Sequence, residues 1–291
     1  MLRAADSPRA DIRLRIALHE AELRANQSDD DLLRVHAALA SEYEKLGDFG
    51  NALRHGQREL TLREHLQGSE HLLTLAARAN IAHWTGEAGD RSRARDMCAE
   101  LLPVVERVLG PNYQGTLRLR NNLALWTGWA GDPAAARKQF AALLSDRERL
   151  SGPLHEDTLE SRNNLALWTG RAGDPAKARR QLTALLRDEE QALPPDYPLI
   201  LITRGNLASF AANPNKARRQ YAALLPDMER VFGPDHPNTQ TVRNLLEHLT
   251  RIVNVQVGPG LLTWSENWCE VCGLEEPQDE ARPSRFPCSQ P

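Results

Sequence analysis

A nine-residue segment recurs at a fixed step of 42 residues, and this periodicity constrains the fold more than any other feature of the sequence. Residues 120–128 read Arg-Asn-Asn-Leu-Ala-Leu-Trp-Thr-Gly, and residues 162–170 repeat them without change. Related segments begin at Arg78 and Arg204, and Gly-Asp pairs keep the same step at Gly47, Gly89, Gly131 and Gly173. Repeats of about 20 to 50 residues are typical of arrays of small structural units. The sequence therefore predicts stacked units.

Each unit is predicted to contain two helices. Residues 158–168 lack Gly and Pro, and their apolar residues recur at helical spacing. Gly170 and the Gly173-Asp174-Pro175 segment then supply a predicted helix C-cap, a turn and a first-turn proline. A second apolar stripe follows at Ala178, Leu182, Leu185 and Leu186, and its equivalents in the previous unit are Ala136, Phe140, Leu143 and Leu144. One hairpin alone would expose this stripe, so stacking on neighbouring hairpins is expected to bury it.

The loops that close the units also repeat. They combine Gly or Pro, which end helices, with one slot that always holds His or Tyr, namely Tyr113, His155, Tyr197 and His236. We interpret this slot as a packing and hydrogen-bonding position. A threonine follows three residues later in three of the loops, and Thr116, Thr158 and Thr239 are predicted to be helix N-caps.

The Asn-Leu-Ala segment, the Gly-Asp turn and the alanine and aromatic or leucine positions of the second helix resemble a tetratricopeptide repeat. The step of 42 residues is longer than the usual ~34 and resembles the repeats of kinesin light chains and of related arrays in high-GC bacteria, which stand alone or follow a signalling NTPase domain. The resemblance covers about residues 32–252. It implies an all-α fold, a right-handed α-solenoid of about five stacked helix-turn-helix hairpins.

Three regions are expected along the chain. Residues 1–30 are read as an N-terminal capping helix or half repeat, because Ala10 lies one 42-residue step before Ala52. Residues 31–252 form the repeat array, and residues 253–291 form a largely irregular, flexible tail.

In the family that the chain resembles, the first helix of each hairpin lines a concave groove. The resemblance implies that the asparagine before each Leu-Ala pair points into this groove, and these residues are Asn80, Asn122, Asn164 and Asn206. An amide donates and accepts hydrogen bonds, so a ladder of amides suits the backbone of an extended peptide. The alternative is that the asparagines tie adjacent helices together, and both roles are compatible.

Residues three and seven positions after each asparagine, and four before it, are expected to share its face. They predict a mixed groove, whose candidate residues are His83, Leu125, Leu167, Arg118, Trp129 and Arg171. Trp129 is a candidate aromatic anchor, and Arg118 and Arg171 are candidate partners for carboxylates. By contrast, Trp84, Trp126 and Trp168 occupy one repeated slot and are predicted to be packing residues.

Charge argues against nucleic-acid and membrane partners. The 291 residues contain 36 Lys and Arg against 39 Asp and Glu, a net charge of −3. A ladder of arginines at Arg78, Arg120, Arg162, Arg204 and Arg243 is interleaved with acidic residues and is predicted to be salt-bridged or solvated. No export signal and no membrane-spanning run are recognised, so we expect a cytoplasmic protein.

No catalytic motif and no cofactor site is predicted. Gly-rich phosphate loops, nucleophile elbows and metalloprotease motifs are missing from the sequence. Cys269 and Cys272 have the spacing of half a zinc site, with Cys288 as a third thiol, but four ligands are not available, so no metal is expected. We predict a non-enzymatic scaffold that binds a protein or peptide partner in its groove. The alternatives are a regulatory arm working with a signalling NTPase, with an empty groove, or an oligomerisation module, since self-association is possible.

Overall fold

The computed structural model describes residues 8–24, 28–234 and 236–255, and all regular secondary structure within these residues is α-helical. The helices, in chain order, are α1 (Pro8–Leu23), α2 (Asp29–Leu46), α3 (Phe49–Gln67), α4 (Leu72–Glu87), α5 (Arg91–Leu109), α6 (Gln114–Trp129), α7 (Pro133–Ser151), α8 (Glu156–Arg171), α9 (Pro175–Ala192), α10 (Pro198–Ser209), α11 (Pro214–Phe232) and α12 (Pro237–Val255). Most of the predicted tail, with its three cysteines, lies outside the described residues.

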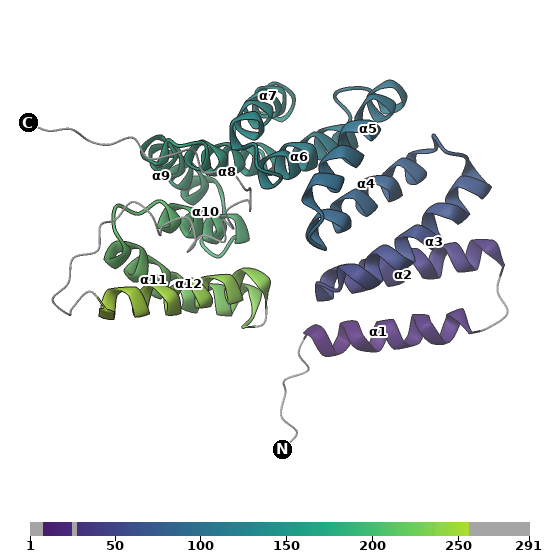
Figure 1. Cartoon of the computed structure of the whole chain (residues 1–291), viewed down its shortest axis with the longest axis horizontal. Coiled ribbons are helices and arrows are strands. Elements are labelled where there is room, and N and C mark those ends of the chain that lie inside the picture. The colour runs from purple at the N-terminus through teal and green to yellow at the C-terminus, as the bar shows by residue number, and fades with distance from the viewer. Residues whose placement is uncertain (1–7, 25–27, 235, 256–291) are drawn as a thin grey trace, which may run out of the picture. The chain divides into compact units, whose positions relative to one another are not determined.

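The chain forms two compact units, residues 1–181 and residues 182–291, and the boundary between them falls inside α9. In the first unit each helix from α1 to α8 packs against the next one along the chain (Figure 1). In the second unit α10 packs on α11, and α11 packs on α12. Such sequential packing of helical hairpins confirms the predicted all-α solenoid class.

The turns inside the hairpins follow the predicted chemistry. Gly131 and Gly173 have φ values of 105° and 99°, in the left-handed region that favours glycine. The aspartate after each such glycine caps the second helix, and the Asp132 carboxylate accepts a hydrogen bond from the Ala135 amide at 2.8 Å. A proline opens α7, as expected for the first helical position.

The threonine N-cap prediction was wrong. Thr116 and Thr158 lie inside α6 and α8 and are fully buried, and Thr239 is buried in the first turn of α12. The loop residue of the His or Tyr slot caps α6 and α8 instead, and the His155 Nδ1 accepts a hydrogen bond from the Asp157 amide at 3.3 Å. An imidazole nitrogen can replace a hydroxyl as acceptor here, so the predicted hydrogen-bonding role holds for His155, whereas Tyr113 stands at the N-cap of α6 without a side-chain capping hydrogen bond.

The repeated tryptophans are confirmed as packing residues. Trp84, Trp126 and Trp168 are at most 3% exposed, and each ring lies against a glycine of the preceding repeat. A Cβ added to Gly128 would lie 2.4 Å from the Trp168 ring, and one added to Gly86 would lie 2.6 Å from the Trp126 ring. The glycine of Trp-Thr-Gly therefore makes room for the next tryptophan. The prediction that Gly170 is a C-cap was wrong, because α8 continues to Arg171.

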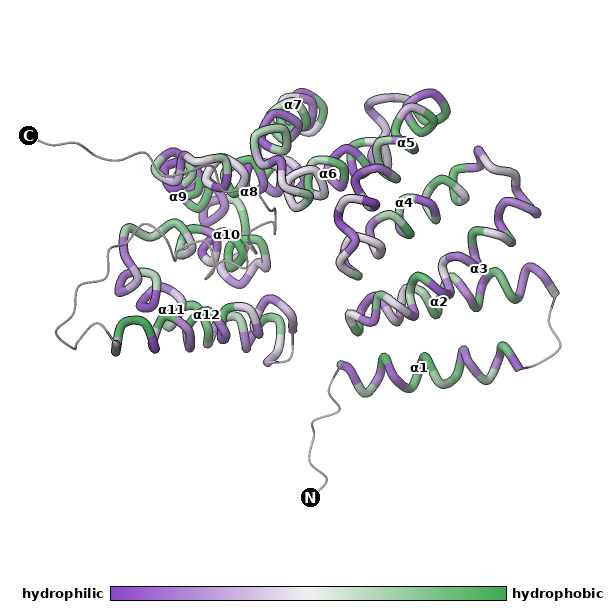
Figure 2. Tube along the Cα trace, viewed as in Figure 1, coloured by the Kyte–Doolittle hydropathy of each residue, from purple (hydrophilic) through white to green (hydrophobic). Residues whose placement is uncertain are grey.

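The core of the first unit consists of successive layers between helices. One layer joins α1 to α4 around Leu39 and Trp84, a second joins α4 to α6 around Leu101 and Trp126, and a third joins α6 to α8 around Phe140. Apolar positions therefore recur along every helix instead of gathering at one centre (Figure 2). Cys98 is fully buried in the second layer, and burial raises the pKa of its thiol to about 12.

Candidate functional site

The candidate residues of the first unit lie on one repeated stripe of the first helices. We define the first-helix stripe as the asparagine of each repeat and the residues three and seven positions after it, namely Asn80, His83 and Glu87 on α4, Asn122, Leu125 and Trp129 on α6, and Asn164, Leu167 and Arg171 on α8. All nine are exposed or half-buried, whereas Ala82, Ala124 and Ala166 between them are fully buried. Helices α4 and α6 also contact each other directly. The stripe is therefore a continuous surface feature across these neighbouring helices.

The asparagines of the stripe differ in their contacts. Asn80 is exposed and Asn122 is half-buried. The Asn164 side chain donates a hydrogen bond to the Asn121 Oδ1 at 3.3 Å and so links α8 to α6. Asn206 belongs to α10 in the second unit, where it is half-buried. Asn164 therefore links adjacent first helices, which is the structural alternative to peptide binding that the sequence analysis had left open for these asparagines.

Trp129 lies in a stack of side chains that the sequence analysis missed. The guanidinium carbon of Arg171 is 4.1 Å from its ring centroid, and that of Arg91 is 5.0 Å from it. Trp168 meets the same ring edge-on, with centroids 5.5 Å apart. Cations over an aromatic face are attracted by the ring quadrupole. Trp129 is thus held between α5 and α8, and the available signal was that Arg171 occupies its position one repeat later.

His83 takes part in a second aromatic contact of the stripe. Its ring centroid lies 5.8 Å from that of Trp126, and its Nε2 lies 3.9 Å from the Glu44 Oε1. Its Nδ1 is buried without a hydrogen-bond partner among the described residues. His83 therefore extends the stripe toward α2.

Charges of both signs flank the stripe. Arg118 is exposed on α6, four residues before Asn122, and Glu160 occupies the equivalent position on α8. Burial raises the pKa of the Glu160 carboxyl, with Asp157 and Glu156 adding to the effect, while the positive charges of Arg147 and Arg118 oppose it. The Arg147 guanidinium lies 3.8 Å from the Glu160 Oε2. The face therefore offers a cation and an anion on adjacent first helices.

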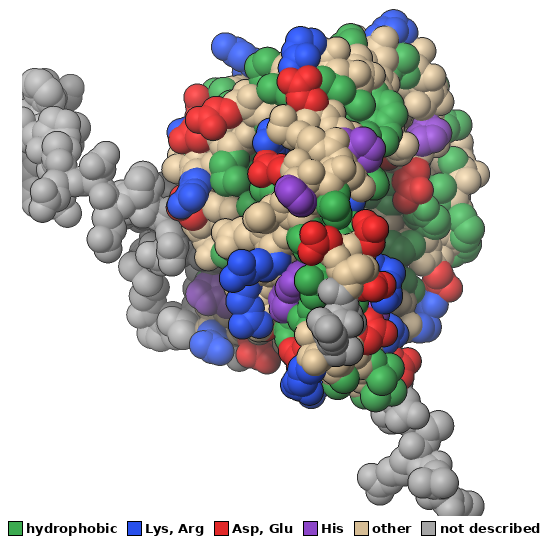
Figure 3. Space-filling model, turned by 90° about the vertical axis from the view of Figure 1, so that its right-hand side faces the viewer, with side chains coloured by type: hydrophobic (Ala, Val, Ile, Leu, Met, Phe, Trp, Pro, Cys, Tyr) green, Lys and Arg blue, Asp and Glu red, His purple; other side chains and the backbone are tan. Residues whose placement is uncertain are grey.

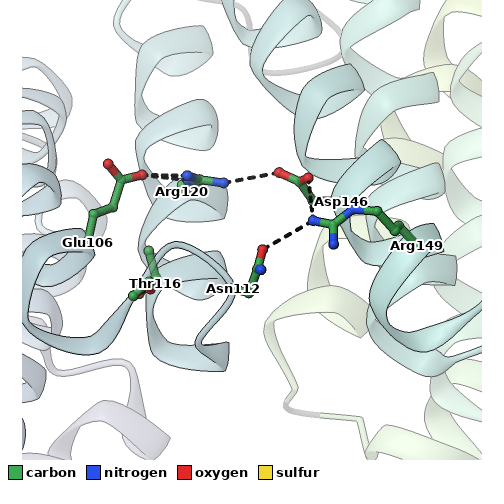
Figure 4. Close-up of polar contacts among 7 residues, drawn as sticks. Glu106, Asn112, Thr116, Arg120, Asp146 and Arg149 are labelled. Carbon is green, nitrogen blue, oxygen red and sulfur yellow. Dashed lines mark hydrogen bonds and ion pairs between the residues drawn. The ribbon is translucent and has the colours of Figure 1, made fainter.

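The arginine ladder is salt-bridged, as predicted. Each arginine with a described partner bonds the glutamate fourteen residues earlier, on the preceding second helix. Arg120 donates hydrogen bonds to the Glu106 Oε1 at 2.9 Å and to the Asp146 Oδ2 at 3.1 Å (Figure 4). The Asp146 carboxylate also accepts a hydrogen bond from Arg149. The face drawn in Figure 3 likewise shows acidic and basic side chains interspersed. These arginines are engaged by carboxylates.

Two further site types can be compared with the part of the chain that the structure describes, a metal site and a membrane span. There, no three His, Cys, Asp or Glu side chains gather as a metal site would require. None of the described helices combines the length and apolarity that crossing a bilayer demands. Cys269, Cys272 and Cys288 lie outside the described residues.

The packing defines a class of protein, an array of helical hairpins that present a shared face of first helices. The tetratricopeptide repeat family matches residues 74–112 and 116–188. Residues 74–112 and 116–188 are therefore tetratricopeptide repeats. Repeats of this kind are typically non-enzymatic scaffolds for protein interaction.

Solved structures share this fold. The nearly identical TPR-like repeats of a kinesin light chain-type protein from Podosopora anserina share 17% identity at a TM-score of 0.56, covering 70% of this chain and 98% of that one. BtubC (BKLC) from P. vanneervenii shares 15% identity at a TM-score of 0.52, covering 91% and 96%. A Rap protein complexed with competence and sporulation factor shares 11% identity at a TM-score of 0.60, covering 86% and 76%. A comparison with curated protein sequences gave no match.

Proposed function

We propose that the chain is a scaffold that holds an extended peptide or a partner helix along the first-helix stripe of α4, α6 and α8. The fold supports this role, because first helices that stack side by side present equivalent side chains at regular intervals. A structural neighbour, the Rap protein, is known in complex with competence and sporulation factor. That complex supports the idea that the fold suits ligand binding.

One observation carries the proposal. Asn80 and Asn122 are equivalent residues on two first helices that contact each other, and both reach solvent, whereas Ala82 and Ala124, two residues further along, are fully buried. An amide that reaches solvent offers a donor and an acceptor together, as a peptide backbone requires. Two such amides at a fixed separation would fix the path of an extended segment.

The surroundings of the asparagines suggest the chemistry of the partner. Leu125 and Leu167 offer apolar contact, while Arg118 and Glu160 offer opposite charges on adjacent helices. The Trp129 ring, held by Arg91 and Arg171, forms a rigid border at the end of the stripe. A partner segment with apolar side chains between polar ones suits this surface better than a strongly charged one.

The test compares binding to the wild-type chain and to a double variant. Peptides are first selected on the immobilised chain from a random library, and the affinity of the tightest one is then measured by fluorescence anisotropy. Asn80→Ala with Asn122→Ala is expected to weaken binding about tenfold or more, because two hydrogen bonds to the peptide backbone are lost. Asn164 is avoided because its bond to Asn121 links two helices.

The control is Asn244→Ala, which removes an exposed amide from α12 and should leave the affinity unchanged. Circular dichroism establishes that both variants keep the helical content of the wild type. Equal affinities for the wild type and the double Asn variant would contradict the proposal.

A further inference from the structure

Helix α1 has two apolar faces, and the described structure covers only one of them. Ile12, Ile16 and Leu23 pack against the core layer that α1 shares with α2. On the opposite side, Leu14 is 61% exposed and Leu18 is 57% exposed, more than any other large hydrophobic residue of the described chain. Hydrophobic positions accordingly recur along the whole of α1 (Figure 2). Solvent exposure of such a stripe is unfavourable.

The repeat register shows what kind of surface this is. Four residues of α1 are equivalent, in the 42-residue repeat, to positions of α3, α5 and α7 that are buried or half-buried. These four residues are Ala10, Leu14, Ala17 and Leu18. The equivalents in α5 are Ala94, Cys98, Leu101 and Leu102, and those in α7 are Ala136, Phe140, Leu143 and Leu144. Helix α1 therefore carries the stripe of a second helix, but no first helix of its own hairpin covers it in the described structure. We name these four residues of α1, together with Ala21, the outer stripe.

We propose that the outer stripe is an interface with a second copy of this chain, in which α1 packs antiparallel on α1 of the partner copy. The stripe is apolar throughout and repeats small and large residues, so it is complementary to itself. A twofold-related pair uses the same patch on both copies. With Leu14 of each copy opposite Leu18 of the other, all five stripe residues become buried.

On one flank of the outer stripe charges favour the antiparallel orientation, while on the other flank Asp11 of each copy comes to lie opposite Glu22 of the other. Arg13 and Glu20 are seven residues apart and flank the outer stripe on the same side. When the α1 helices of two copies pack antiparallel, this flank of one helix faces the same flank of the other, which runs in the opposite direction. Arg13 of each copy then lies opposite Glu20 of the other. The Glu20 carboxylate already accepts a hydrogen bond from the Tyr43 hydroxyl at 2.7 Å, and a carboxylate can accept further bonds.

The other helix at an end of the described array is a poorer partner for this stripe. Helix α12 exposes Asn244, Glu247, His248 and Arg251. Packing Leu14 and Leu18 against these groups would remove charges from water without pairing them. Association of α1 with α1 is therefore favoured over association of α1 with α12 of another copy.

The interface is small, so the association is expected to be weak and reversible. A helix of 16 residues is ~24 Å long, and a contact of that length lies at the lower end of specific interfaces. Sedimentation velocity of the full chain should show a monomer–dimer equilibrium with a dissociation constant in the micromolar range.

The main test uses Leu14→Glu with Leu18→Glu, at positions exposed enough for the chain to fold normally. This variant is expected to remain monomeric at concentrations up to ~200 µM, a loss of at least tenfold in self-association. The matched control is Leu154→Glu, which changes a leucine that is 53% exposed in the turn after α7 and should leave the dimer intact. Circular dichroism of all variants establishes that the helices are kept.

A second test locates the contact along α1. Ala17 lies near the proposed twofold axis, so Ala17→Cys should give a covalent dimer with a short thiol crosslinker, above the background set by the native cysteines. Arg13→Glu should weaken the dimer several-fold while leaving the apolar stripe unchanged.

The proposal would be overturned by a wild-type chain that stays monomeric at every concentration, by a dimer that survives the double Leu variant, or by crosslinking of the Ala17→Cys chain no greater than background. A monomer in which Leu14 and Leu18 are nevertheless protected from solvent would mean that another segment of the chain covers the stripe, and this too would overturn it.

Discussion

The tryptophan of each Trp-Thr-Gly segment packs against a glycine of the preceding repeat. Stacking of the repeats therefore depends both on the large tryptophan ring and on the absence of a side chain at that glycine. Gly56, Gly86 and Gly128 are all helical, and each would place a Cβ within 2.6 Å of a tryptophan ring. Glycine in a helix interior costs up to ~1 kcal/mol relative to alanine. The close approach of the ring compensates for that cost.

This packing predicts opposite effects of one substitution at two helical glycines. Gly128→Ala should lower the free energy of unfolding by ~1–3 kcal/mol, because its Cβ would overlap the buried Trp168 ring. Gly205→Ala on α10 should raise it by ~0.5–1 kcal/mol, because the nearest side-chain atom is 3.6 Å away and alanine favours the helix. Urea unfolding followed by circular dichroism measures both. Stabilisation by Gly128→Ala would contradict the packing account.

At the scale of the element, the α2–α3 hairpin contains a histidine pair that responds to pH. The Nδ1 atoms of His36 and His55 are 2.9 Å apart, so only one of them carries a hydrogen. Arg54 lies 3.5 Å from the His55 Nε2, and that contact requires Nε2 to be the acceptor. The His55 Nδ1–H therefore donates to His36, and Tyr43 stacks on the His55 ring. The neutral pair is satisfied, but a proton added at the His55 Nε2 would remove the acceptor of Arg54, and a proton added at the His36 Nδ1 would remove the acceptor of His55.

Acid should therefore destabilise this hairpin. Burial, with the charges of His36 and Arg54, lowers the pKa of His55 from 6.5 to about 4, while Glu20 opposes the shift, and burial also lowers the pKa of His36. Between pH 6.5 and about 4 the unfolded state binds more protons than the folded one, so stability falls as the pH falls through this window. His55 alone contributes a loss of ~3 kcal/mol across it.

Hydrogen exchange of residues in α2 and α3 at pH 4.5 and pH 7 measures the effect. His55→Gln should remove much of the pH dependence, since glutamine does not titrate. His65→Gln, at an exposed position of the same helix, should keep it. The same pH dependence in wild type and His55→Gln would rule out this role of the pair.

The order and approximate extent of the helices could be predicted from the sequence because the 42-residue step repeats the same Gly, Pro and Asp punctuation. The helix caps were less predictable, since His155 caps through a ring nitrogen while Thr158 is buried inside the helix. The Trp129 stack was missed because it joins residues of different repeats, Arg91 and Arg171, whose proximity depends on stacking. Helix α1 lies in the segment predicted to be a capping helix or half repeat, but the exposure of its outer stripe could not be predicted, because it depends on how α1 packs on α2.

At the scale of the whole molecule, we propose that the first helices are the face presented to partners, while the second helices are engaged in packing and ion pairs. The asparagine, leucine and aromatic positions of α4, α6 and α8 recur on one stripe. The glutamates of the second helices α3, α5 and α11 are bonded by arginines of the helices that follow them. A bound segment would therefore contact every first helix that it crosses and few second helices.

The most direct test is hydrogen–deuterium exchange of the full chain with and without a saturating selected peptide. The account predicts slower exchange in α4, α6 and α8 when the peptide is bound, with exchange in α5 and α7 changed little. Slower exchange confined to α5 and α7, with α4 and α6 unchanged, would contradict it.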